Sequence, residues 1–203
     1  TSGSTSGTSG TSGTGSGGGG SGGIGDSGAG GSGIVIIRYL LGTIPSNNLL
    51  TNANEPIITS PTFTETVRSF THSGGTETQT THTITIGQNT ICDILIVGGG
   101  GAGGGRQGGG GGAGGVMFLE NQQLAPGNYT IKVGKGGGAE FQGAPENGKD
   151  SELGTFIAYG GSGAGGFSIA KSDFNITTNR FGSGGGAMGW NNDGGYDGWH
   201  NAN

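Results

Sequence analysis

Charged side chains are scarce in this sequence, which limits the partners that it can bind. Only 10% of the 203 residues are charged, and eight basic residues are scattered along a chain of net charge −5. A nucleic-acid-binding surface needs lysines and arginines gathered on one face, because contacts to phosphates dominate its affinity. The composition therefore argues against nucleic acid as a partner.

Cysteine and long apolar runs are also missing. Cys92 is the single cysteine, which excludes an intramolecular disulfide and a cysteine-based zinc site. Its place between Ile91 and Ile94 predicts a buried or half-buried strand residue, with an intermolecular disulfide as the alternative. No apolar run reaches the length of about 18 residues that a transmembrane helix needs. The chain lacks a starting methionine and opens within a repeat, so we expect a processed product or a fragment.

Catalytic and metal-binding patterns are absent from the sequence as well. The three histidines stand in polar stretches without the spacing of a nucleophilic or metal site: His72, His82 and His200. Asp193, Asp197 and His200 lie close together, but their spacing is not that of a calcium loop. We therefore expect no enzyme, no cofactor and no metal.

Glycine is abundant instead, and the stretch from Gly98 to Gly115 dominates the chain. Fourteen of its 18 residues are glycine, and it follows the apolar run Ile94–Val97. Its first glycines fit the dinucleotide-binding pattern G-x-G-x-x-G, with Glu120 about 20 residues further on. That pattern needs a helix after the first glycines. A helix with nine or ten glycines would lose on the order of 10 kcal/mol relative to alanine, so the dinucleotide interpretation fails.

Packed polyglycine strands are the interpretation that we favour for this stretch. Glycine has no side chain, so extended strands with three residues per turn can approach as closely as their backbones allow. A flexible linker is the alternative, but linkers rarely alternate with strands so regularly. The chain supplies several such tracts: Gly15–Gly33, Gly98–Gly115, Gly134–Gly138, Gly160–Gly166 and Gly182–Gly198.

Strand-forming sequences separate the glycine tracts. The alternation in HTITI predicts a half-buried strand, whereas the continuous apolar run of Ile34–Leu41 predicts burial on both faces. Other expected strands are 63–70, 80–86, 94–97, 116–119, 129–133 and 155–159, with a loop over 134–154. We therefore predict a mainly β protein: an antiparallel β-sandwich-like body with packed polyglycine II strands and little or no helix.

Three parts are expected along the chain: residues 1–41, a linker at 42–61, and a glycine-rich β domain at 62–203. The first 23 residues are Thr-Ser-Gly triplets that run into glycine, which suits a helix with three residues per turn. A flexible spacer explains this stretch equally well, and O-linked glycosylation is a candidate if the protein is secreted. Asn128 and Asn175 lie in N-x-[ST] sequons and are candidate N-glycosylation sites.

The order of these pieces resembles a known family. The series CDILIVGGGGAGG, then PGNYTIKVGKGG, NGKDS and FIAYGGSGAGG is similar to the glycine-rich domain repeated in surface and fibre-like proteins. Such proteins occur in phages, large viruses, algae and environmental microbes, and some phage tail-fibre tips have packed polyglycine II strands. In that family the sequence GGSGIVIIRY closes a domain after its last glycine tract. Here the matching Gly30–Tyr39 comes first.

This displaced strand suggests how the chain assembles. A body without its closing strand has an open sheet edge, and an apolar strand needs a partner sheet. We expect Ile34–Leu41 to insert into a neighbouring copy, giving a head-to-tail homopolymer. The alternative is circular permutation, in which the strand folds back into its own sheet. The candidate inter-protomer residues are Ile34, Val35, Ile36, Ile37, Tyr39 and Leu40.

The sequence thus predicts a structural protein, the protomer of an extracellular or cell-surface fibril that carries glycans. The alternative is a viral or phage adhesin that recognises a sugar or a protein on a cell surface. In that case Trp190, Tyr196 and Trp199 would stack on the ligand. An ice-binding glycine helix fits the tracts but leaves the strands unexplained.

Overall fold

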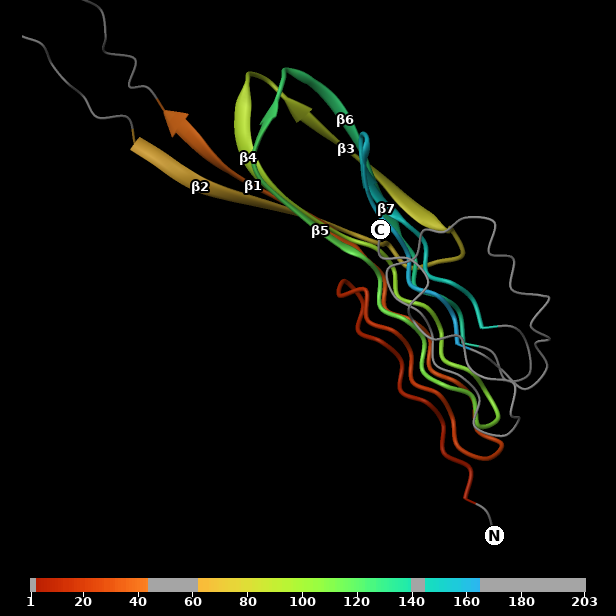
Figure 1. The fold of residues 1–203 in the computed structure, drawn as a ribbon. Helices are drawn as coiled ribbons and strands as arrows, with labels where there is room; N and C mark the ends of the chain where they lie inside the picture. The colour runs from red at the N-terminus through yellow and green to blue at the C-terminus, as the bar shows by residue number, and fades with distance from the viewer. Residues whose placement is uncertain (1–2, 44–61, 140–144, 165–203) are drawn as a thin grey trace, which may run out of the picture.

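The protein is elongated, with a β-sandwich at one end and glycine segments at the other (Figure 1). The structure is a computed structural model and describes residues 3–43, 62–139 and 145–164. These residues contain strands and extended segments but no helix. The prediction of a mainly β protein is confirmed.

Two four-stranded antiparallel sheets form the sandwich. One sheet has the order β2-β1-β4-β5 and the other the order β3-β6-β7-β8. The strands are β1 (Ile34–Thr43), β2 (Thr62–Thr71), β3 (Gln79–Ile86), β4 (Thr90–Val97), β5 (Val116–Leu124), β6 (Gly127–Gly134), β7 (Ser151–Leu153) and β8 (Phe156–Ala158). The short strand β7 was missed by the sequence, which indicated a loop over 134–154.

The hydrophobic core lies between the two sheets. Alternate residues of β1 and β4 point inward, and Val35, Ile37, Ile94 and Ile96 are each fully buried. Strands β6 and β7 supply Ile131, Val133 and Leu153 from the opposite sheet. Cys92 also faces the core with 2% of its surface exposed, as its apolar neighbours predicted.

Burial of Ile34–Leu41 on both faces was a wrong prediction. Ile34 and Ile36 are half-buried, and Leu40 keeps 60% of its surface exposed. The reason is the two-layer architecture: within residues 3–43, 62–139 and 145–164, no second sheet lies against the outer face of this sheet. An apolar run alone cannot distinguish a central strand of a sandwich from a strand covered on both sides.

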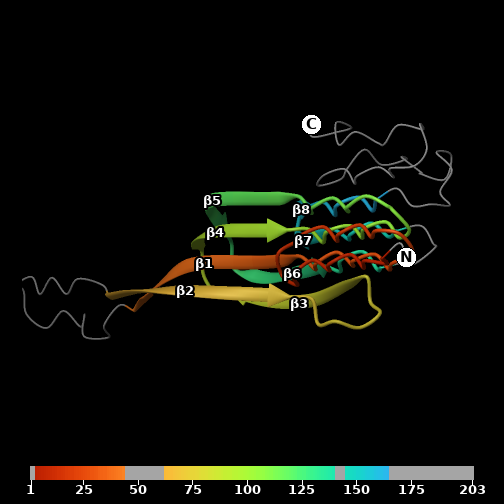
Figure 2. The ribbon, with the colours of Figure 1, turned by 90° about the horizontal axis from the view of Figure 1, so that it is seen from below.

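Eight extended segments form a bundle beyond one end of the sandwich, where they run side by side (Figure 2). Six of them adjoin a strand in the sequence with no residues between, so the chain passes straight from a strand of the sandwich into a segment of the bundle, or the reverse. The segments are 3–11, 16–22, 25–33, 98–104, 108–115, 134–138, 145–150 and 159–164. Only the first two are not attached to a strand.

Segment 98–104 lies at the centre of the bundle and hydrogen-bonds to six other segments. Its N–H groups donate in a three-residue cycle. Gly98, Gly101 and Gly104 donate to segment 108–115, Gly99 and Ala102 to segment 145–150, and Gly100 and Gly103 to segment 25–33. Its carbonyl groups accept hydrogen bonds from segments 16–22, 134–138 and 159–164. A cycle of three residues with six neighbours is the arrangement of packed polyglycine II, as predicted.

Close backbone contact makes glycine obligatory at Gly99 and Gly101 of this central segment. A Cβ atom on Gly101 would lie 2.0 Å from the carbonyl oxygen of Ser162, and one on Gly99 would lie 2.1 Å from that of Lys135. Backbone atoms cannot move away as the end of a flexible side chain can. The glycines are therefore the packing surface of the bundle rather than spacers.

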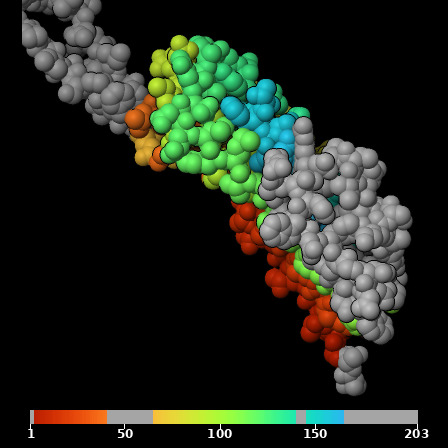
Figure 3. Space-filling model, viewed as in Figure 1, coloured from red at the N-terminus to blue at the C-terminus, as the bar shows by residue number. Residues whose placement is uncertain are grey.

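The Thr-Ser-Gly triplets of segment 3–11 place each residue type on its own side. Gly7 and Gly10 face the bundle, where added Cβ atoms would lie 2.1 and 2.4 Å from carbonyl oxygens. The threonines and serines between them are exposed on the bundle surface, red in Figure 3. The described part of the first 23 residues thus belongs to the bundle, which favours the three-residue helix over a flexible spacer.

Candidate assembly site

Strand β1 holds the six residues that the sequence singles out for contact between protomers. In the structure it lies between β2 and β4 of the same chain and is antiparallel to both. Ile34 pairs with Thr71 and with Val97, and the β1–β2 pairing continues to Thr43 opposite Thr62. The single chain therefore fills its own central position, which is the arrangement of the circularly permuted alternative. Exchange between copies stays a prediction.

The two faces of β1 make different contributions to this position. Val35, Ile37 and Tyr39 point into the sandwich, where the first two are fully buried and Tyr39 packs against the core. Ile34, Ile36 and Leu40 point outward. The inward residues therefore carry most of the burial energy, at about 25 cal/mol per Å² of apolar surface.

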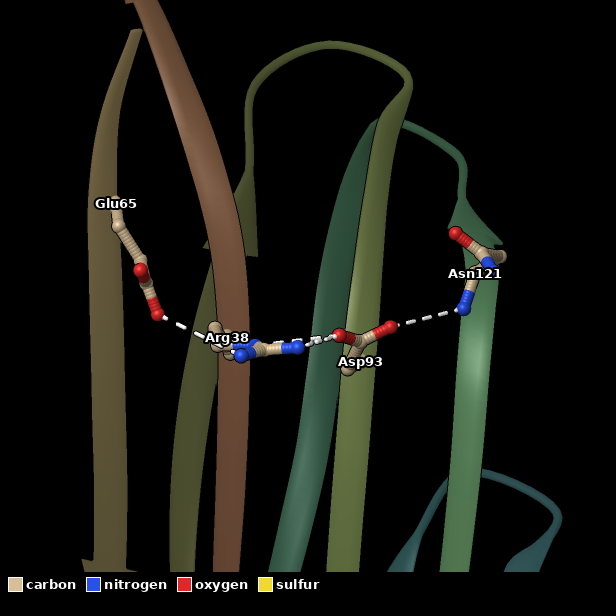
Figure 4. A network of polar contacts seen from close by, with 4 residues as sticks. All are labelled: Arg38, Glu65, Asp93 and Asn121. Atoms are coloured by element: carbon tan, nitrogen blue, oxygen red, sulfur yellow. Dashed lines mark hydrogen bonds and ion pairs between the residues drawn. The ribbon is translucent and has the colours of Figure 1, made fainter.

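A polar network fixes β1 against both neighbouring strands (Figure 4). Arg38, on the outer face, donates from Nε and Nη2 to Oδ2 of Asp93 on β4, with an Nε–Oδ2 distance of 3.2 Å. Its Nη1 lies 3.7 Å from Oε1 of Glu65 on β2. The other Asp93 oxygen accepts the backbone N–H of Asn121 on β5 at 3.0 Å. One row of polar contacts thus crosses all four strands of the sheet, through side chains on β2, β1 and β4 and a backbone N–H on β5.

The network depends on an irregularity where β4 meets β5. The register of this pair shifts between Cys92 and Ile94, so Asp93 has no single residue opposite it on β5. Opposite it, Asn121 has a positive φ of 52°, a conformation that asparagine tolerates better than most residues. This bulge turns the Asn121 N–H toward the carboxylate.

Asp93 is held in its charged form by these contacts. The hydrogen bond from Arg38, and after it the one from Asn121, lower the pKa of Asp93 below its usual range. The same hydrogen bond to Asp93 raises the pKa of Arg38. Cys92 next to them has a raised thiol pKa because burial disfavours the thiolate, and Asp93 adds to the effect. The arrangement positions a strand and offers neither a general base nor a nucleophile.

The contribution of Asp93 to the free energy of unfolding should decrease in acid. Because its pKa is lower in the folded protein than the unfolded value of about 3.9, its contribution is fully present above pH 4 and is lost as the pH falls through the folded pKa. We expect Asp93→Asn to lower the free energy of unfolding at pH 7, and the gap to wild type to narrow toward pH 2. Urea denaturation between pH 2 and 7 measures this gap. Glu65→Gln is the control with the smaller effect, since both partners of that pair are more than half exposed.

A groove of about 610 Å³ opens beside the network and includes Leu40, Ile91 and Asn89 in its wall. Its charged groups, Arg38, Asp93 and Glu65, already pair with one another. Within the described ranges, no three His, Cys, Asp or Glu side chains gather as a metal site would require. The groove therefore has no free charged group to fix a ligand.

The remaining candidate residues are spread over the chain. His72 and His82 bond through Nε2 to backbone carbonyls, of Glu77 and Thr71 respectively. Asn128 is exposed on β6, where its Oδ1 accepts a hydrogen bond from Thr85 at 2.8 Å. Glycosylation there stays a prediction. The other candidates lie outside the described residues: Asn175, Trp190, Asp193, Tyr196, Asp197, Trp199 and His200.

Sequence reasoning missed the roles of Arg38, Glu65 and Asn121. A signal for two network members was present, since Arg38 and Asp93 each interrupt an otherwise apolar run, IVIIRYLL and ICDILIV. Single opposite charges in two apolar strands predict neighbouring strands with those charges opposite each other. Asn121 gave no such signal, because its role depends on the bulge.

Comparison with known proteins places this architecture in a family. The family model of the glycine-rich domain matches residues 76–202, which is more than half of the chain. The chain belongs to the glycine-rich domain family. No curated protein and no solved structure matches it.

The matched region of the glycine-rich domain begins after β2. It includes β3 to β8 and the central segment 98–104, but not β1 or the three glycine segments before it. The part of the glycine-rich domain that the structure describes has no helix long and apolar enough to cross a membrane. Strand β1, which occupies the centre of one sheet, thus comes from outside the matched region.

Proposed function

We propose that this chain is the structural protomer of an extracellular or cell-surface fibre, in which β1 of one copy occupies the sheet of the next. Its relatives would be the fibre-like glycine-rich proteins of phages, large viruses, algae and environmental microbes. The observation that carries the proposal is the position of β1. It sits between β2 and β4 at the centre of one sheet, and the family match includes β4 but neither β1 nor β2.

The connection from β1 to β2 supports exchange. Thr43 and Thr62 are directly paired, so a turn of two to five residues would be enough to join the strands of one copy. Eighteen residues, 44–61, stand there instead. Fully extended, a segment of that length reaches roughly 60 Å. This is far more than a hairpin needs and enough to reach another molecule.

The same reach matches the length of one protomer. Ten residues of β1 at about 3.3 Å each, preceded by the nine residues of segment 25–33 at about 3.1 Å each, give a body of roughly 60 Å. After exchange, the connection between β1 and β2 starts at the end of β1 in one body and finishes at the start of β2 in the next. These two positions are equivalent in the two bodies, so the connection has to span one body length. A head-to-tail arrangement satisfies this condition, and such a heterologous contact continues without closing.

The surface supports a role outside the cell. Threonine and serine hydroxyls cover the outer side of segment 3–11, and Asn128 presents a sequon on an exposed strand. Glycans at these positions would coat the fibre without entering either the core or the glycine bundle. A polymer with few charges gains solubility from such a coat.

The test uses the direct opposition of Tyr39 and Cys92. A donor chain carries Tyr39→Cys and Cys92→Ser, an acceptor chain is native, and the two are refolded together and oxidised. Neither chain alone can form the 39–92 disulfide, so a disulfide between residue 39 of the donor and residue 92 of the acceptor appears only when β1 crosses between copies. Mass spectrometry of the linked peptides separates this mixed dimer from 39–39 and 92–92 dimers, which run alike on a non-reducing gel. We expect this dimer as a major product.

Two controls define the outcome. A donor with Leu40→Cys and Cys92→Ser carries its thiol on the outward face and should not link, which tests for random collision. A single chain with Tyr39→Cys and native Cys92 must close within itself or form a ladder, which verifies the geometry. Electron microscopy of the native chain and of a chain lacking Ile34–Leu41 completes the test. Monomers or trimers from the native chain, with no mixed dimer, would overturn the fibre and favour the adhesin.

A further inference from the structure

We propose that the unit exchanged between copies is the whole of residues 3–43, and that β1 does not move alone. This N-terminal module consists of segments 3–11, 16–22 and 25–33 together with β1. Its partner is a second copy of this chain, through the glycine segments that follow β4 and β6 and precede β5. The inference rests on the proposed function and specifies what the neighbouring copy recognises.

The three glycine segments of the module hold one another together. Every pair among them shares backbone hydrogen bonds, so they form a closed triangle that needs no other segment. In each bond the N–H of the first residue donates to the carbonyl oxygen of the second. Segments 16–22 and 3–11 are joined by Gly19–Thr8 and Gly22–Thr5, segments 3–11 and 25–33 by Gly7–Asp26 and Gly10–Ala29, and segments 25–33 and 16–22 by Gly28–Gly19 and Gly31–Ser16. The triangle is therefore a preformed unit that can leave one body and enter another.

The glycine part of the module contacts three other glycine segments of the chain. Backbone bonds join it to the central segment 98–104, to segment 108–115 and to segment 134–138. They run from Gly18 to Gly101, from Ser21 to Gly104, from Gly100 to Gly31, from Gly103 to Gly28, from Gly111 to Gly18, from Gly114 to Gly15, from Gly30 to Gly137 and from Gly33 to Gly134. Of the six neighbours of the central segment, two thus belong to the module and two more hydrogen-bond to it.

Chain continuity prevents β1 from moving without these segments. Gly33 donates its N–H to Gly134 at 2.9 Å, and the next residue, Ile34, pairs with Val97. If β1 entered a neighbour while the triangle stayed behind, the chain would have to cross between two bodies within one peptide bond. The triangle and β1 must therefore occupy the same body, whichever copy supplies it.

The two halves of the module also fix its register together. A sheet accepts a shift of two residues, because this returns each side chain to the same face. A polyglycine bundle accepts a shift of three residues, because its hydrogen bonds repeat every turn. Only a shift of six residues, about 20 Å, satisfies both. A module that spans sheet and bundle thus enters a neighbour in one register, which β1 alone does not secure.

Donor variants test the module in the 39–92 disulfide assay. Gly30→Ala in the donor puts a Cβ 2.0 Å from the Gly100 carbonyl oxygen of the body, whereas the matched control Gly3→Ala has nothing within 4 Å. Against a native acceptor, we expect the Gly30→Ala donor to give at least ten-fold less mixed dimer than the Gly3→Ala donor. A donor that lacks residues 3–33 but keeps β1 should fail in the same way.

The outcomes separate this inference from the proposed function. A misfolded donor still offers β1, so if β1 alone were recognised, the Gly30→Ala and truncated donors would link as well as the control. That result would overturn the module while leaving strand exchange intact. Absence of mixed dimer from the Gly3→Ala donor as well would overturn both. Loss confined to the two altered donors supports the module.

Discussion

Gly101→Ala is expected to destabilise the protein by about 3 kcal/mol, a large share of the roughly 5 to 15 kcal/mol that keeps a domain folded. The added Cβ would lie 2.0 Å from the Ser162 carbonyl oxygen and 2.3 Å from its carbonyl carbon. Relief would require segment 159–164 to move away from the central segment. That movement would break the hydrogen bonds that Gly161 and Ala164 donate to Gly99 and Ala102.

A glycine in the same tract provides the control. A Cβ on Gly110 would have its nearest atom at 3.5 Å, an ordinary contact, and no positive φ is recorded there. Gly110→Ala should therefore leave stability unchanged or raise it by up to about 1 kcal/mol, because alanine restricts the unfolded chain. Urea denaturation followed by circular dichroism measures both variants. Equal stability of the two would show that the tract is not closely packed.

The contrast also explains why part of the fold could be predicted from the sequence. Gly98–Gly115 is too rich in glycine to form a helix and has too few apolar side chains to build a core, so dense backbone packing was the remaining ordered state. The alternation of Ile84 and Ile86 in HTITI likewise left one arrangement for β3. In both places, local chemistry favoured one ordered structure over the others.

Other parts depend on contacts that local sequence does not contain. Strand β7 has three residues, Ser151–Leu153, and exists because Leu153 is buried against the core and Ser151 accepts the Gly134 N–H at 3.0 Å. Asn121 reaches Asp93 only through the bulge in the β4–β5 pair. The origin of β1 is a different case, since the same pairs form whether the strand comes from its own copy or from a neighbour.

Ile37→Ala should have the second large effect, a loss of about 2 to 5 kcal/mol in the free energy of unfolding. Ile37 is fully buried at the centre of β1 and pairs with Arg68 on β2 and Ile94 on β4. Removing its side chain leaves a cavity between the two sheets that neighbouring strands cannot close. Thermal and urea denaturation measure the loss.

Leu40→Ala is the matched control for this position. It lies on the same strand with the opposite orientation and keeps 60% of its surface exposed, so the expected loss is below about 1 kcal/mol. Similar losses from both variants would contradict the inward and outward assignment of β1. In the proposed fibre, Ile37 would fill the core of whichever body receives β1, so Ile37→Ala should also lower the denaturant concentration at which filaments dissociate. Leu40→Ala should leave that concentration nearly unchanged, so the pair links the stability of one sandwich to the strength of the fibre.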